Sequence, residues 1–177
     1  MAHSSGGDGE GSGSWLASEA AAFCIRFAII AAVAFTALSL VTDDEIAPYL
    51  TALAAATVDC LALFGLDVTR DGTLVSALGF TIRVEGQCSA LYETALLGAA
   101  ILASPFPVWR RLVGILVGAS AILVVNIVRI ASLVVIGALA PRWFTSAHLF
   151  VWQAILVALI ASFWLVWIDR AREATAS

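Results

Sequence analysis

The chain has 177 residues, of which 62% are hydrophobic and only 12% are charged. An ordinary soluble domain has about 45–50% apolar residues with glycine included, and about 25% charged residues. A soluble fold of this length would expose much of its surplus apolar surface to water. The composition therefore excludes a soluble globular domain, a disordered chain and a disulfide-rich secreted domain. It predicts an all-α polytopic membrane protein with about four to six membrane-embedded helices.

The charges and cysteines exclude two further classes. Nine basic residues, all arginine, stand against 13 acidic residues, for a net charge of -4. They form no long basic run, so nucleic acid is not an expected partner. The cysteines Cys24, Cys60 and Cys88 show no CxxC spacing and no nearby histidine. Neither a metal site nor another cofactor is expected.

The first third of the chain predicts a tail, a span and an ambiguous helix. Residues 1–19 are rich in glycine and serine and predict a flexible tail, while residues 20–172 predict a single membrane-embedded domain. Ala20 to Val41 is apolar and, at about 1.5 Å per residue, long enough to cross a bilayer. Ile46 to Leu66 is also apolar but carries Pro48 and Asp59. It is either a second span or a helix on the membrane surface.

The next segment changes character. Asp67 to Gly72 is polar and predicts a turn. From Thr73 to Glu85 two short runs rich in Val, Phe, Thr and Ile flank Gly79, and the second run alternates between apolar and polar residues. This pattern predicts a small β-hairpin outside the hydrocarbon layer.

Three helices are expected after the hairpin. The first, Cys88 to Ala103, is closed by Pro105 and Pro107, because two prolines forbid continuation. The other two are expected at Leu112 to Ala140, where Pro141 follows, and at His148 to Ile168.

The arginines predict the orientation of these helices. Arg110 with Arg111, and Arg170 with Arg172, are the two dense basic sites near span ends, so the positive-inside rule places both in the cytoplasm. Cys88, His148 and the hairpin are then extracytoplasmic, and the acidic stretch after Val41 makes residues 46–66 a surface helix. This topology has four spans and an N-terminus inside.

Three chemically reactive or costly side chains converge on the outer side in this topology: Cys88, Arg129 and His148. Each has an ordinary alternative, namely a buried cysteine, a structural arginine and a wetted histidine at the interface. Cys88 opens a predicted helix, whose N-terminus is expected to lower the pKa of the thiol. Arg129 lies inside an apolar helix, which is costly unless the guanidinium faces protein or water.

Further polar residues surround Arg129. Asn126 and Ser132 lie three residues to either side and share a helix face with it. Glu93 lies in the first turns of the cysteine helix and is expected to pair with an arginine or orient substrate. We therefore expect Asn126, Glu93 and Ser132 to bind substrate or support the three main residues.

A cysteine, a histidine and an arginine together indicate acyl transfer. The thiolate attacks a peptide carbonyl, the histidine moves the proton, and the guanidinium stabilises the oxyanion. Two other classes stay open: a thiol-redox membrane enzyme using Cys60 and Cys88, and a non-catalytic membrane scaffold. The redox enzyme requires both cysteines, whereas acyl transfer requires Cys88 alone.

At these residues the sequence resembles the exosortase/archaeosortase family of integral-membrane transpeptidases, most closely the short exosortase H type. The resemblance runs from about Ile46 to Ala171. It rests on Gly72 to Val84 leading into Gln87-Cys88-Ser89, on Asn126-Ile127-Val128-Arg129-Ile130, and on Ala147-His148-Leu149-Phe150-Val151-Trp152-Gln153.

The resemblance implies a membrane cysteine protease and transpeptidase with Cys88 as nucleophile and Arg129 and His148 completing the site. It implies protein substrates whose C-terminal sorting signal has a short motif, a transmembrane helix and an arginine-rich end. The acyl product would pass to an unidentified amine, at the extracytoplasmic face of a bacterial inner membrane. One residue departs from the pattern: the family usually has glycine two positions after the cysteine, where this chain has Ala90.

Overall fold

The computed structural model describes the backbone of residues 9–176 and the side chains of residues 17–173. Six α-helices, a three-stranded sheet and two short helical turns make up the fold. The α-helices are α1 Gly9–Ser39, α2 Ala47–Leu63, α3 Leu91–Ala103, α4 Val108–Leu139, α5 Pro141–Ser146 and α6 Trp152–Ala176. The chain is thus an all-α membrane protein with a small sheet, as the composition predicted.

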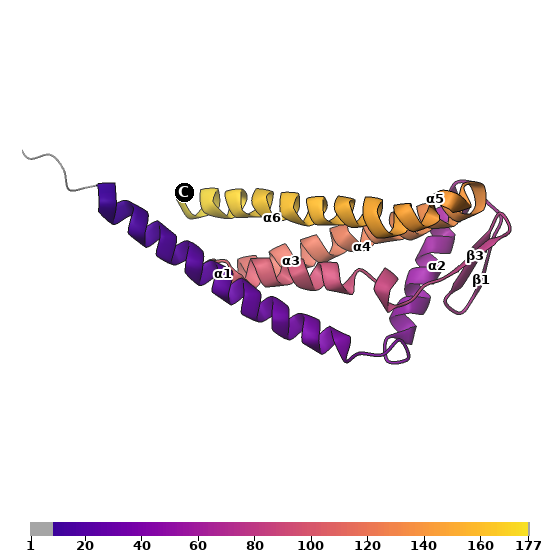
Figure 1. The fold of residues 1–177 in the computed structure, drawn as a ribbon, viewed down its shortest axis with the longest axis horizontal. Coiled ribbons are helices and arrows are strands. Elements are labelled where there is room, and N and C mark those ends of the chain that lie inside the picture. Colours follow the sequence, from indigo (N-terminus) through magenta and orange to yellow (C-terminus); the bar gives the residue numbers. More distant parts are fainter. Residues whose placement is uncertain (1–8, 177) are drawn as a thin grey trace, which may run out of the picture.

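The long helices share one direction (Figure 1). In this view α3, α4 and α6 lie along the long axis of the molecule, α1 slants away from them, and α2 runs across them at the end that carries the sheet. This crosswise course agrees with the interpretation of residues 46–66 as a surface helix.

Three stretches in the described part are long and apolar enough to cross a membrane: Ala17–Ser39, Val108–Leu139 and Pro141–Glu173. The expected four spans included the helix that follows Cys88. This helix, α3, has 13 residues, and at about 1.5 Å per residue it is shorter than a hydrocarbon core of about 30 Å. It packs inside the bundle between α1, α4 and α6.

The sheet has one strand more than expected. Its strands β1 Val68–Asp71, β2 Leu74–Ala77 and β3 Phe80–Arg83 are antiparallel in the order β1-β2-β3. The predicted hairpin is β2 and β3, joined at Leu78-Gly79, where both residues have positive φ as in the type I′ turns that suit hairpins. The expected turn at Asp67 to Gly72 is mostly strand β1. Its residues after Val68 are exposed, so β1 shows no apolar alternation.

Helix α4 is the centre of the packing. One buried cluster joins it to α2 and the sheet, and a second joins it to α3 and α6. Glycines on α4 allow the close contacts: Gly118 lies against Leu97 and Phe163, and Gly137 lies against the ring of Phe80. Helix α4 is therefore held by buried side chains on two sides, and this packing fixes the positions of its polar residues Asn126 and Arg129.

Of the helix boundaries that differ from the prediction, three bear on the tail or on the candidate site. Helix α1 begins at Gly9, inside the segment expected to be a flexible tail; residues 1–8 lie outside the described residues. Helix α3 begins at Leu91 because Ala90 has φ 58 and cannot continue a right-handed helix. The polar connection expected before His148 is helical, since α5 runs through a π-helical turn, Ala147–Val151, into α6.

Candidate active site

The nucleophile candidate lies in a short turn. Cys88 is the last residue of the 3₁₀ turn Gly86–Cys88, two residues before the left-handed Ala90. We call residues 86–89 the cysteine turn. Its backbone is closed locally by hydrogen bonds from Cys88 N to Glu85 O, at 2.8 Å, and from Ser89 N to Gly86 O, at 3.1 Å.

Three side chains from other elements hold the cysteine turn by its backbone. The carboxamide of Asn126, on α4, donates to the carbonyl of Cys88 at 2.7 Å. The hydroxyl of Tyr49, on α2, donates to the carbonyl of Ser89 at 2.7 Å. The carboxylate of Asp43, in the α1–α2 connection, accepts from the N–H of Gly86 at 3.1 Å. The turn is therefore fixed to two helices and a loop far from it in sequence.

Cys88 and His148 line the same small cavity. Its volume is about 40 Å³, and strand β3, its extension and α4 supply most of the other walls. The remaining lining residues are Ile82, Arg83, Val84, Ile130, Leu133 and Phe144. Residues 60 positions apart thus meet at one cavity, as the topology predicted for these two side chains.

His148 is held by an aromatic stack. Its ring lies nearly parallel to that of Phe144, with centroids 6.0 Å apart and an angle of 5° between the planes. Phe144 in turn contacts Phe80 of β3, with centroids 5.6 Å apart. The sequence predicted that His148 begins a helix, and this was wrong because helical structure already precedes it. It lies in a π-helical turn, a local geometry that often occurs at functional sites.

Arg129 is buried beside the cysteine turn, with 3% of its surface exposed. Its Nη1 lies 3.8 Å from Oε1 of Glu93, in the first turn of α3. This distance makes an ion pair and is too long for a hydrogen bond. Nε and Nη1 of Arg129 are buried and have no hydrogen-bond partner among the described residues. The expected pairing of Glu93 with an arginine is confirmed.

Burial raises the pKa of the Cys88 thiol, and this effect outweighs the charge of Arg129 and a hydrogen bond from the Glu85 backbone, which lower it. The carboxylates of Glu85 and Glu93 add to the increase. The expectation that a helix N-terminus lowers this pKa was wrong, because Ala90 separates Cys88 from α3. A raised pKa favours the neutral thiol, so a reaction through this sulfur would require a base.

The other predicted residues fall in two places. Asn126 is fully buried at the cysteine turn. Ser132 donates its hydroxyl to the carbonyl of Arg129 at 2.8 Å and faces a different, apolar groove of about 430 Å³ between α2 and α4. Cys60 lines that groove as well. The structure therefore brings Cys88 and His148 to one cavity. Asn126 holds the cysteine turn, and the Arg129–Glu93 pair lies outside the cavity lining, as Ser132 and Cys60 do.

Sequence reasoning missed Tyr49, Asp43 and Phe144. Tyr49 lies in an alanine-rich helix and Asp43 in an acidic connection, and neither context signals a contact about 40 residues away. Phe144 is one of many aromatic residues near a predicted interface. Only the fold shows that these three side chains support Cys88 or His148.

Comparison with known proteins identifies the family of the chain. A family model described as transmembrane exosortase (Exosortase EpsH) matches residues 11–166. The chain belongs to the transmembrane exosortase family. No curated protein and no solved structure matches it. The resemblance inferred from the sequence is thus confirmed, and membership implies that this exosortase is a membrane enzyme of the cysteine peptidase and transpeptidase kind.

Proposed function

We propose that this exosortase cleaves C-terminal sorting signals of exported proteins through a Cys88 thioester and transfers the acyl product to an amine. The observation that carries the proposal is the shared cavity of Cys88 and His148. The charge of Arg129 acts on both side chains. Acyl transfer requires a nucleophile and a base that meet, as Cys88 and His148 do in this cavity, and a cation whose charge reaches them supports it.

In the first step His148 takes the proton of the neutral Cys88 thiol as the sulfur attacks the substrate carbonyl carbon. The new C–S bond leaves a negative oxygen, which the unpaired N–H groups of Arg129 stabilise. The C–N bond then breaks, and His148 returns the proton to the departing amine. The product is a thioester on Cys88 and the released C-terminal segment.

In the second step an acceptor amine attacks the thioester. Its proton passes to His148, the C–S bond breaks, and the sulfur recovers a proton to regenerate the thiol. Water in place of the amine gives hydrolysis. Glu93 holds Arg129, and Asn126 holds the Cys88 carbonyl, so both position the reacting groups without contacting substrate.

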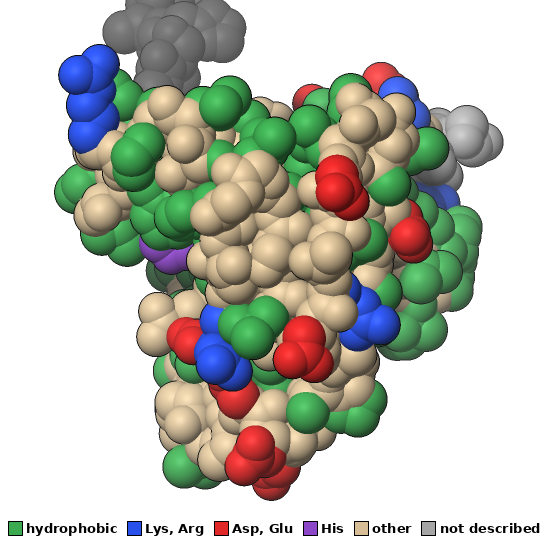
Figure 2. Space-filling view, turned by 90° about the vertical axis from the view of Figure 1, so that its right-hand side faces the viewer, with side chains coloured by type: hydrophobic (Ala, Val, Ile, Leu, Met, Phe, Trp, Pro, Cys, Tyr) green, Lys and Arg blue, Asp and Glu red, His purple; other side chains and the backbone are tan. Residues whose placement is uncertain are grey.

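The substrates and location follow from the same proposal. A substrate would carry a short motif outside the membrane, one transmembrane helix and an arginine-rich end. The enzyme would reside among lipids of a bacterial inner membrane. Figure 2 looks at the end of the molecule that carries the sheet, where charged side chains of both signs lie exposed. A substrate chain that leaves the membrane at this exposed polar end would meet the cavity of Cys88 and His148 there.

The test uses co-expression with an exported protein that has such a C-terminal end. Cys88→Ala should abolish the mobility shift that marks processing, while the protein stays folded in the membrane. Cys60→Ala is the matched control and should process normally. Processing by Cys88→Ala would exclude the proposal, and loss in Cys60→Ala as well would favour the redox alternative.

A further inference from the structure

Strand β3 has a free edge that leads to the nucleophile. In the order β1-β2-β3 it is an outer strand, paired only with β2. Val84 N donates to Thr73 O at 2.9 Å, which fixes the phase of this ladder. Hydrogen-bonded and non-bonded pairs alternate in an antiparallel ladder. The backbone N–H and C=O groups of Ile82 and Phe80 therefore also point toward β2.

The residues between these three have backbone groups that point away from β2. Thr81 and Arg83 direct their backbone N–H and C=O groups to the free edge, and both residues are exposed. Among the described residues, no other backbone group bonds to these two. Glu85 follows in extended conformation, with φ -117 and ψ 172. Its carbonyl already accepts from Cys88 N at 2.8 Å, so the row of free backbone groups ends at Arg83.

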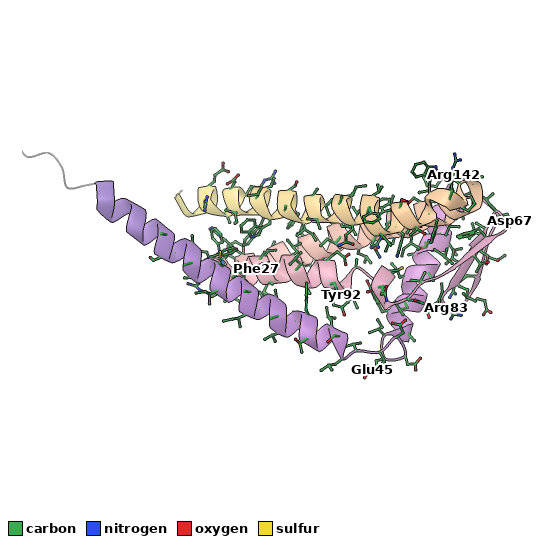
Figure 3. All side chains as sticks on the ribbon, viewed as in Figure 1. Phe27, Glu45, Asp67, Arg83, Tyr92 and Arg142 are labelled. Atoms are coloured by element: carbon green, nitrogen blue, oxygen red, sulfur yellow. The ribbon has the colours of Figure 1, made fainter. Side chains whose placement is uncertain are left out.

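Cys88 follows this row closely in the chain. Its backbone N–H donates to the carbonyl of Glu85 at 2.8 Å. Arg83, beside the free edge, lines the cavity that Cys88 and His148 share. Figure 3 shows Arg83 at the end of the molecule where α2 and the sheet meet. One edge thus presents backbone groups first and the nucleophile last.

We propose that the free edge of β3 binds the peptide substrate as an added strand, from Thr81 to Arg83, and so delivers the scissile carbonyl to Cys88. This inference rests on the proposed function. The occupant is an extended peptide segment, because a carbonyl within a helix is already bonded and enclosed, whereas an extended chain satisfies its own backbone groups by pairing. At about 3.3 Å per residue the edge accommodates about three or four residues.

The mode of binding limits what is recognised. Main-chain pairing supplies affinity whatever the side chains are, and specificity comes from alternate side chains of the added strand. A segment with proline at a position that must donate to the edge is excluded there. The opposite edge of the sheet, on β1, lies away from the cavity and offers an internal comparison.

The test measures alkylation of Cys88 in the full chain, reconstituted in lipid, with Cys24 and Cys60 replaced by alanine. The reagents are acetyl-tetraalanine chloromethyl ketone, the corresponding single-alanine reagent, and iodoacetamide. Each forms an S–C bond to Cys88 and releases halide. We expect the tetraalanine reagent to react faster than the single-alanine reagent. N-methylation of the tetraalanine backbone should slow the reaction only at every second residue, because only those N–H groups would face the edge of β3.

Two proline variants localise the effect. Arg83→Pro removes an outward N–H without removing a bond to β2, and should lower the ratio of tetraalanine to iodoacetamide rates by about tenfold. Arg83→Ala keeps the N–H but loses the side chain that lines the cavity, so it should lower the ratio less than Arg83→Pro does. Arg70→Pro is the matched control, since Arg70 is an exposed arginine of β1 that points away from β2 in the same way.

A rate independent of peptide length, or a uniform effect of N-methylation, would overturn the edge proposal. Equal ratios for Arg83→Pro and Arg83→Ala would do the same. The N-methylated reagents need no variant, so they decide the matter even where Arg83→Pro does not fold. Alkylation does not depend on transpeptidation, whereas processing by Cys88→Ala concerns only the proposed function, so the two failures are distinguishable.

Discussion

The carboxamide of Asn126 donates a hydrogen bond of 2.7 Å to the backbone carbonyl of Cys88, across 38 residues of sequence. It joins the buried face of α4 to the turn that carries the thiol, three residues before Arg129 on the same helix. Through this bond one helix sets the position of the sulfur and of the cation that acts on it. The relationship explains why Asn126 is fully buried although it is polar.

Asn126→Ala should lower the free energy of unfolding by about 1–3 kcal/mol, because it leaves the Cys88 carbonyl without its partner. It should also slow processing at saturating substrate more than it weakens substrate binding, since the thiol loses its fixed position. Thermal unfolding in detergent and the processing rate measure the two effects. Ser120→Ala, an exposed hydroxyl on the same helix, is the control and should change stability by less than about 0.5 kcal/mol. Equal losses in both variants would contradict the assigned role.

The pH dependence of Cys88 alkylation should reflect its surroundings. Burial raises the pKa of this thiol, so half-maximal reaction with iodoacetamide should occur at higher pH than for a free cysteine. Arg129 favours the thiolate, so Arg129→Gln should move the midpoint further up. Glu93 disfavours the thiolate, so Glu93→Gln should move it down. The profile is measured with Cys24 and Cys60 replaced, and shifts of the opposite sign would show that other groups control the thiol.

The sequence predicted the parts of this site that carry an unusual chemical cost. An arginine in an apolar helix and a cysteine after a hairpin stand out in a chain with so few polar residues, and the hairpin itself shows in the alternation of Phe80, Ile82 and Val84. Strand β1 and the contacts of Tyr49 left no such signal, because an exposed edge strand has no apolar face and a hydroxyl-to-backbone bond does not depend on pattern. The π-helical turn at His148 arises from packing and was likewise invisible.

Ala90 occupies a backbone conformation that favours glycine. Its φ is 58, and its methyl group is buried with only 3% exposed. Relief of left-handed strain gives about 1–2 kcal/mol, while loss of the methyl group costs about 0.8 kcal/mol and the freer unfolded chain about 0.4–1 kcal/mol. Ala90→Gly should therefore change stability by less than about 1 kcal/mol. Ala90→Val should destabilise by more than about 2 kcal/mol, because a β-branched residue fits neither the conformation nor the space. Chemical denaturation measures both, and tolerance of valine would refute the assignment.

The contact between Gly137 and Phe80 should couple the sheet to α4. A methyl group on Gly137 would overlap the Phe80 ring, which Phe144 confines from another side. Gly137→Ala should destabilise by about 1–3 kcal/mol and slow processing, since Phe144 also stacks on His148. Gly98→Ala, in α3 with open space around it, should instead gain up to about 1 kcal/mol. Adding Phe80→Leu to Gly137→Ala should restore part of the loss, with a coupling energy of about 0.5–3 kcal/mol. Additive effects in this double-mutant cycle would show that strand β3 does not depend on Gly137 for its place beside Cys88.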